Sequence, residues 1–226
     1  VFGLIVGTYG TLVGLGGGFI VVPVLLLIYR ADPQDTVGTS LAVIFLNAVS
    51  GSISYIRIKR VDLRSGTKFA LATVPGAAIG AYAASYLTSW FLSLAFGILM
   101  VTVSVFMLWK PEFRPANGQE VTPLRDRLTT RRLIDADGNT FNYSFNERLG
   151  VIISVFVGFL SSILGIGGGV IHVPALIHLL AFPAHIATAT SQFILVITTG
   201  VGAASHLALG QVLLGPAIAM GAGTIA

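Results

Sequence analysis

Charged residues divide the chain into long apolar stretches. Every Asp, Glu, Lys and Arg falls in one of three polar windows, at residues 30–35, 57–68 and 110–148. The apolar runs are 1–29, 36–56, 69–109 and 149–226, and the last of them contains 78 residues without a charge. Because a membrane span needs about 20 such residues, the pattern predicts an all-α protein, a polytopic helical membrane protein.

The length of each apolar run indicates how many spans it holds. Residues 36–56 are long enough for one helix, and 69–109 would be about 60 Å long as a helix, so this run is expected to fold into two spans with a turn near Leu87–Trp90. Residues 186–209 form another span, and a further span begins at Val212. In the last polar window, Asp137-Gly138 predicts the tight turn of a β-hairpin.

Two apolar stretches are broken by glycines in the same way. The segment "GLGGGFIVVP" at 14–23 returns as "GIGGGVIHVP" at 165–174, and "TS" follows at 39–40 and again at 190–191. With an offset of 151 residues, 6–61 and 157–212 share 15 identities in 56 positions. Internal repeats of this kind are common in transporters.

The chain is therefore interpreted as two sequence-related halves with glycine-broken first helices. Residues 1–109 form the first transmembrane repeat, 110–148 a polar loop, and 149–226 a second repeat that is incomplete at its C-terminal end. The offset of the repeat places the end of a complete second half at about residue 260, so roughly a span and a half is expected after Ala226.

Two arrangements of the broken units remain open. A unit that crosses the bilayer once gives about four spans per half and parallel repeats, whereas a unit that turns back gives five and inverted repeats. The basic windows 57–68 and 110–148 flank a pair of spans, which favours four. Both windows are expected to face the cytoplasm, and 30–35 the outside.

The glycine breaks also predict chemistry. A half-helix that starts near Gly18 or Gly169 exposes amide groups that have no intrahelical partner and carry partial positive charge. Such a helix start binds anions without a cationic side chain. The expected substrate-binding residues are these glycines and the polar residues of the following span: Gly16, Gly17, Gly18, Thr39, Ser40, Asn47, Gly167, Gly168, Gly169, Thr190, Ser191 and Gln192.

Purely structural roles are the alternative for these residues. Glycine-rich membrane helices also serve close packing, and hydroxyl groups in such helices often bond to their own backbone. His172 and His206 lie within the spans and are candidates for proton coupling. A neutral, hydrogen-bonded histidine is the alternative for each.

Several functional classes are not expected. The spans contain no Asp or Glu and no histidine with an evident nucleophile partner, so neither an enzyme nor a catalytic residue is predicted. No metal site or cofactor is expected. The net charge of +4 reports orientation in a membrane protein rather than binding to nucleic acid.

The segments "LVGLGGGFIVVPVLLL" and "ILGIGGGVIHVPALI", each followed by its Thr-Ser span, resemble the TauE/SafE family of membrane permeases. That resemblance implies export of sulfite or of a small organosulfur anion such as a sulfonate. The expected protein is a secondary transporter of a bacterial cytoplasmic (inner) membrane that works by alternating access between its two halves. An anion channel and a non-transporting scaffold are the alternatives. The expected partners are the small anion, the lipid bilayer and a second copy in a homodimer.

Overall fold

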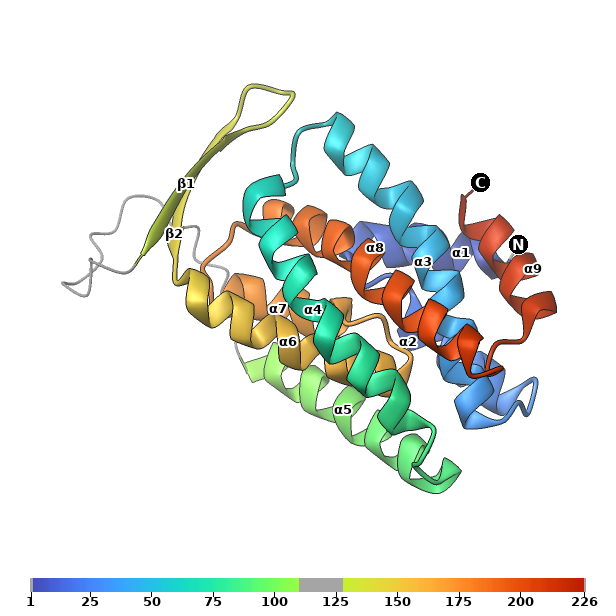
Figure 1. Ribbon diagram of the computed structural model, residues 1–226. Coiled ribbons are helices and arrows are strands. Elements are labelled where there is room, and N and C mark those ends of the chain that lie inside the picture. The colour runs from blue at the N-terminus through green and yellow to red at the C-terminus, as the bar shows by residue number, and fades with distance from the viewer. Residues whose placement is uncertain (1, 110–127, 226) are drawn as a thin grey trace.

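The computed structural model describes residues 2–109 and 128–225, which form a mainly helical bundle with one β-hairpin (Figure 1). The helices are α1 (Phe2–Val13), α2 (Gly18–Leu27), α3 (Pro33–Arg57), α4 (Leu63–Ala84), α5 (Ser89–Trp109), α6 (Glu147–Leu164), α7 (Gly169–His178), α8 (Ala184–Ala208) and α9 (Leu214–Ile225). The strands are β1 (Thr129–Ile134) and β2 (Thr140–Phe145). Within the described ranges, α3, α5, α6 and α8 are long and apolar enough to cross a membrane. The prediction of a polytopic helical membrane protein is confirmed.

The β-hairpin forms where the Asp137-Gly138 pair predicts it. Strands β1 and β2 are antiparallel, with Arg131 opposite Tyr143, and Gly138 takes the left-handed conformation that such turns need. The guanidinium of Arg60, just after α3, forms an ion pair of 3.3 Å with Asp135 in the turn. The hairpin is therefore fastened to the end of α3.

The hairpin docks on one end of the bundle. The rings of Tyr143 and Phe145 pack on Phe182, which follows α7, with centroid distances of 4.6 and 4.9 Å. At the opposite end, the side chain of Gln34 donates to the carbonyl of Leu87, which joins the start of α3 to the turn after α4. The two basic segments that the structure describes, 57–68 and 128–148, consequently lie together at one end.

Each glycine-broken unit turns back on itself. In the second unit, a methyl group at Gly168 would contact Val157 on α6, and one turn further along α7 the His172 ring meets Ser154 on α6. In the first unit, Val6 on α1 packs with Val21 and Leu25 on α2. Residues later in α2 and α7 thus meet residues earlier in the preceding helix. The number of spans in each half, expected to be about four, stays a prediction.

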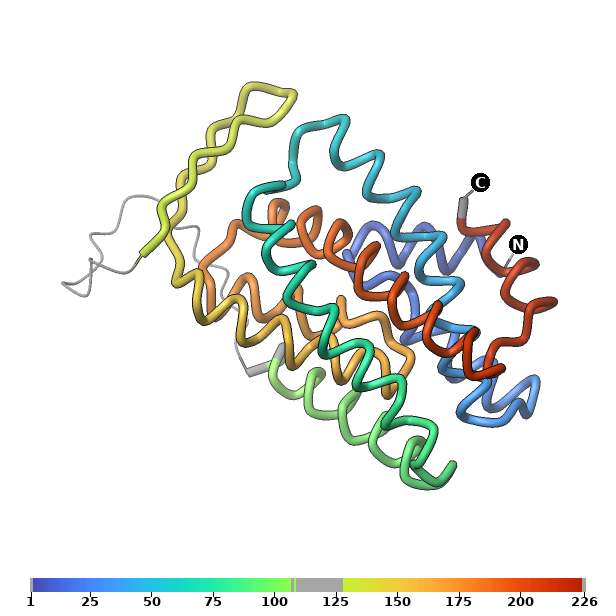
Figure 2. Tube along the Cα trace, viewed as in Figure 1, coloured from blue at the N-terminus to red at the C-terminus, as the bar shows by residue number. Residues whose placement is uncertain are grey.

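Helices of the two halves interlock. Helix α4 lies along α6, as Figure 2 shows, and α3 packs against α8 and α9. Helix α1 packs against α9. A methyl group at Gly158 would lie 2.3 Å from the carbonyl oxygen of Thr73, and one at Gly7 would lie 2.8 Å from the Cα of Thr224. These glycines bring the backbones of the two halves into direct contact.

Candidate substrate site at the paired glycine breaks

Both glycine breaks lie at half the depth of the bundle. A methyl group at Gly16 would meet Ile44 on α3 at 2.6 Å and Leu195 on α8 at 3.1 Å, and one at Gly167 would meet the same two residues at 2.9 and 3.4 Å. Helices α3 and α8 are 25 residues long, and Ile44 and Leu195 stand near the midpoint of each. The two breaks therefore converge where the two long helices cross.

The breaks also contact each other directly. A methyl group at Gly18 would lie 2.8 Å from the carbonyl carbon and oxygen of Ile166 in the second break. In the reciprocal contact, a methyl group at Gly169 would lie 2.6 Å from the carbonyl oxygen of Gly14 and 2.7 Å from the Cα of Leu15. Such short separations permit only glycine at these two positions.

The start of each returning helix presents amide groups without acceptors. Gly17 and Gly168 are the N-caps of α2 and α7, and both are buried in the left-handed conformation, with φ of 87° and 79°. Within the part of the chain that the structure describes, no hydrogen bond is donated by the amides at the two helix starts, which are those of Gly17, Gly18, Phe19, Gly168, Gly169 and Val170. A buried amide without a partner is unfavourable, and a set at a helix start attracts an anion.

The serines of the repeated Thr-Ser pairs tie each half to the break of the other. The hydroxyl of Ser40 on α3 donates to the carbonyl of Gly165 at 2.7 Å. The hydroxyl of Ser191 on α8 donates to the carbonyl of Gly14 at 3.2 Å. Both serines are therefore brought to the breaks, where they hold the backbone in place.

The threonines of the same pairs bond to the segments that precede α4 and α9. The hydroxyl of Thr190 accepts from the amide of Asp62, which precedes α4, at 3.1 Å. The hydroxyl of Thr39 accepts from the amide of Leu213, which precedes α9, at 2.9 Å. Each threonine is the seventh residue of its helix, about 9 Å from the helix start. These bonds connect the halves at opposite ends rather than at the breaks.

Two side-chain amides form hydrogen bonds at or next to the first break. Asn47 donates to the carbonyl of Gly16 at 3.1 Å and accepts from the hydroxyl of Thr11 at 3.0 Å. The Nε2 of Gln192 donates to the backbone carbonyl of Asn47 at 3.4 Å. The Oε1 of Gln192 is buried without a partner among the described residues. At the offset of 151 residues Asn47 aligns with Thr198, so the polar surroundings of the two breaks differ.

Both candidate proton-coupling histidines are buried and hydrogen-bonded. The Nε2 of His172 lies 3.1 Å from the Ser154 hydroxyl. The ring of His206 contacts the Gln211 side chain at 2.9 Å and the carbonyl of Ser162 at 3.0 Å. Proton coupling through either residue stays a prediction.

Sequence reasoning missed the residues that cover the breaks. Ile44 and Leu195 are buried and fill the space over Gly16 and Gly167, but their apolar character makes them resemble ordinary core residues. Ser161 was missed as well, although its buried hydroxyl is without a partner among the described residues. The signal that could have found Ile44 and Leu195 is their equivalence in the two halves at the offset of 151 residues.

Ser40→Ala and Ser191→Ala are expected to destabilise the protein by similar amounts. Each substitution leaves a buried backbone carbonyl without its donor, which costs about 1–3 kcal/mol and lowers the thermal unfolding temperature in detergent. The control is Ser93→Ala on α5, because Ser93 is exposed and bonds only to its own helix. Unchanged unfolding temperatures in both test variants would show that these bonds do not join the halves.

Glycine breaks at half the depth of interlocked apolar helices, next to helix starts whose amides have no acceptor among the described residues, are typical of helical membrane transport proteins. The comparisons with known proteins give the particular family. The chain belongs to the sulfite exporter TauE/SafE family, whose model matches residues 1–226. The protein is accordingly a multi-pass membrane transporter and not an enzyme.

Relatives from several organisms carry the same general description. The chain is 38% identical over 219 residues to the probable membrane transporter protein YunE of Bacillus subtilis, covering 94% of this chain and 78% of that protein. It is 26% identical over 213 residues to a probable membrane transporter protein of Methanocaldococcus jannaschii, covering 92% and 70%. A probable membrane transporter protein of Xylella fastidiosa is 30% identical over 182 residues, with 80% and 62% covered. No solved structure matches the chain.

Proposed function

We propose that this protein is a secondary transporter that exports sulfite, or an organosulfur anion such as a sulfonate, across a bacterial cytoplasmic membrane. The observations that carry the proposal are that both breaks contact Ile44 and Leu195 at mid-depth and that the amides of the two helix starts have no acceptor among the described residues. The spans place no Lys or Arg there, so backbone donors are the source of positive potential. The family description supports sulfite as the first substrate to test.

The two halves are inverted repeats in this proposal. Starts of equivalent helices differ by 151 residues, as for α2 and α7, α3 and α8, and α4 and α9. Contacts between the halves recur at the same offset: the bond from Ser40 to Gly165 matches that from Ser191 to Gly14. Because both broken units turn back, each half is expected to hold five helices rather than four spans.

The paired threonine contacts are the gates of alternating access. Thr190 and Asp62 close the basic end, which faces the cytoplasm by the positive-inside rule. Thr39 and Leu213 close the opposite end. For an anion to reach the amides, one gate separates while the other stays closed, and the side chains of Ile44 and Leu195 move aside.

Sulfite flux in proteoliposomes tests the proposal. Uptake of labelled sulfite is expected to saturate, to be inhibited by an alkyl sulfonate, and to accelerate when the vesicles contain unlabelled sulfite. Acceleration by internal substrate follows from alternating access because the loaded carrier returns faster. Absence of flux above protein-free vesicles contradicts anion transport, and non-saturating flux without acceleration indicates a channel.

A further inference from the structure

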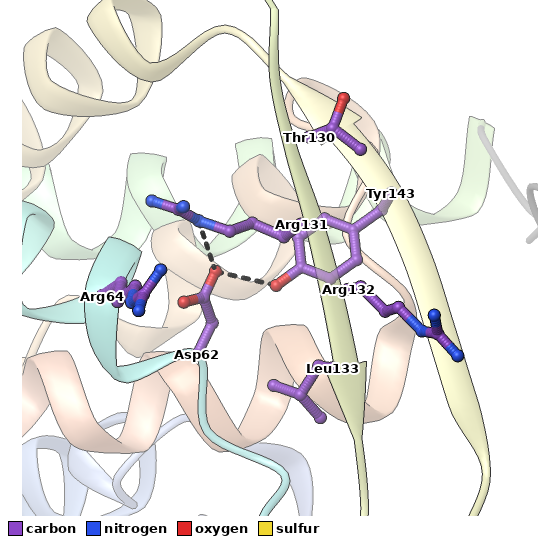
Figure 3. A pocket seen from close by; sticks show the side chains of 7 residues that line it. All are labelled: Asp62, Arg64, Thr130, Arg131, Arg132, Leu133 and Tyr143. Carbon is purple, nitrogen blue, oxygen red and sulfur yellow. Dashed lines mark hydrogen bonds and ion pairs between the residues drawn. The ribbon is translucent and has the colours of Figure 1, made fainter.

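A pocket of about 340 Å³ lies beneath the β-hairpin, at the basic end of the bundle (Figure 3). Its lining residues come from the segment before α4, the start of α4 and both strands: Asp62, Arg64, Thr130, Arg131, Arg132, Leu133 and Tyr143. Three of them are arginines and one is an aspartate, so the lining carries an excess of positive charge.

Two of the arginines have donors to spare. Within residues 2–109 and 128–225, Arg64 is exposed and forms no hydrogen bond or ion pair. Arg131 donates to the Ser65 hydroxyl through Nε, which also lies 3.8 Å from the carboxylate of Asp62, and its terminal nitrogens are not used by these contacts. Figure 3 shows Arg131 directed at Asp62, whereas Arg132 leaves the strand on the other side.

The carboxylate of Asp62 is already occupied by fixed donors. One oxygen accepts from the amide of Ser65 at 3.1 Å, and the other accepts from the hydroxyl of Tyr143 at 2.8 Å. Burial and the adjacent Asp62 carboxylate raise the pKa of Tyr143 above its usual range, so the hydroxyl keeps its proton. Both oxygens of the Asp62 carboxylate thus have other hydrogen-bond donors. The guanidinium of Arg64 and the terminal nitrogens of Arg131 are therefore available to a ligand.

The pocket is linked to the breaks through a short series of contacts. The amide of Asp62, in the pocket wall, donates to Thr190 at the gate of the basic end. The next residue, Ser191, donates to the carbonyl of Gly14 in the first break. An anion held in the pocket is consequently one gate away from the unpaired amides.

We propose that this pocket is an entry site, in which Arg64 and Arg131 bind the oxyanion from the cytoplasm before it passes Thr190. The inference rests on the proposed function. A guanidinium group donates two parallel hydrogen bonds to a pair of oxygens, which suits sulfite and sulfonates. A cationic pocket at the mouth also raises the local anion concentration. A phospholipid headgroup presents the same oxyanion chemistry, so the experiment must separate the two sources.

Arg64→Gln tests the entry site, with Arg148→Gln as the matched control. Both variants lose one positive charge at the same end, but Arg148 does not line the pocket. In everted membrane vesicles, Arg64→Gln is expected to raise the half-saturating sulfite concentration at least fivefold, with the maximal rate within twofold of wild type. Arg148→Gln is expected to stay within twofold in both. Equal concentration dependences for the two variants overturn the proposal.

Vesicle orientation and lipid composition distinguish the two candidate ligands of the pocket, which are sulfite and a phospholipid headgroup. In right-side-out vesicles, where sulfite enters from the opposite end, Arg64→Gln is expected to leave the half-saturating concentration unchanged. In proteoliposomes the fivefold effect is expected with phosphatidylcholine alone and with added phosphatidylglycerol. An effect that requires phosphatidylglycerol assigns the pocket to a lipid headgroup and overturns the entry site.

Calorimetric titration of the detergent-purified protein with sulfite separates this inference from the proposed function. Arg64→Gln is expected to weaken sulfite binding at least fivefold, and Arg64→Lys to restore part of it. If wild type binds sulfite through Arg64 but shows no flux, the proposed function fails and the pocket stands. If wild type transports sulfite but Arg64→Gln alters neither binding nor flux, the pocket fails and the proposed function stands.

Discussion

Gly169→Ala is expected to reduce sulfite flux at least twentyfold while the protein still inserts in the membrane. The added methyl group would lie 2.6 Å from the carbonyl oxygen of Gly14, so the two breaks must move apart, which separates the two sets of helix-start amides. Gly169 does not have a positive φ, so close approach alone produces the effect. Gly18→Ala repeats the experiment from the other half, because its methyl group would lie 2.8 Å from Ile166.

Gly97→Ala is the matched control for these two variants. Among the described residues, no atom lies within 4 Å of a methyl group at Gly97 on α5, and alanine favours a helix over glycine by about 1 kcal/mol. Flux within twofold of wild type is expected. Size-exclusion profiles and unfolding temperatures show whether Gly18→Ala and Gly169→Ala remain folded. Folded variants with wild-type flux would remove the breaks from the transport site.

The stronger substitutions Gly17→Leu and Gly168→Leu extend the same comparison. Both positions adopt the left-handed conformation, which costs an ordinary residue about 1–2 kcal/mol. A leucine at either position therefore adds backbone strain to steric conflict. These variants address the helix starts themselves, whereas the alanine variants address the contact between the breaks.

The local features of the fold were predictable because local physics determines them. The uncharged run 36–56 became α3, and the turn expected near Leu87–Trp90 lies between α4 and α5. The hairpin formed at Asp137-Gly138 because only a few residue pairs suit so tight a turn. Helix starts at Gly18 and Gly169 follow from glycines that allow the chain to leave and re-enter a helix.

The path of the broken units could not be predicted in the same way. Whether such a unit crosses or turns back depends on contacts between distant segments, such as Gly158 with Thr73. The second half has no charged loop that would report its topology. The offset of 151 residues indicates which residues are equivalent but not which residues touch. For this reason the sequence places each Thr-Ser pair at one site, although Ser40 bonds to a break and Thr39 bonds to the segment before α9.

Engineered disulfides across the two gates are each expected to stop sulfite flux, and a reducing agent is expected to restore it. The chain contains no cysteine, so the only pairs formed are the introduced ones. Thr39→Cys with Leu213→Cys targets one end, where the threonine hydroxyl lies 2.9 Å from the Leu213 amide. Thr190→Cys with Asp62→Cys targets the other end, where the corresponding distance is 3.1 Å. Alternating access requires each gate to open in turn, so locking either one interrupts the cycle.

A disulfide within the hairpin provides the control for these two pairs. Ile134 and Thr140 face each other across the strands, neither lines the pocket beneath the hairpin, and the hairpin is expected to move as one unit. Ile134→Cys with Thr140→Cys should therefore form a disulfide and keep flux within twofold of the reduced protein. Full flux with either gate locked would contradict alternating access, because an end that never opens cannot release an anion.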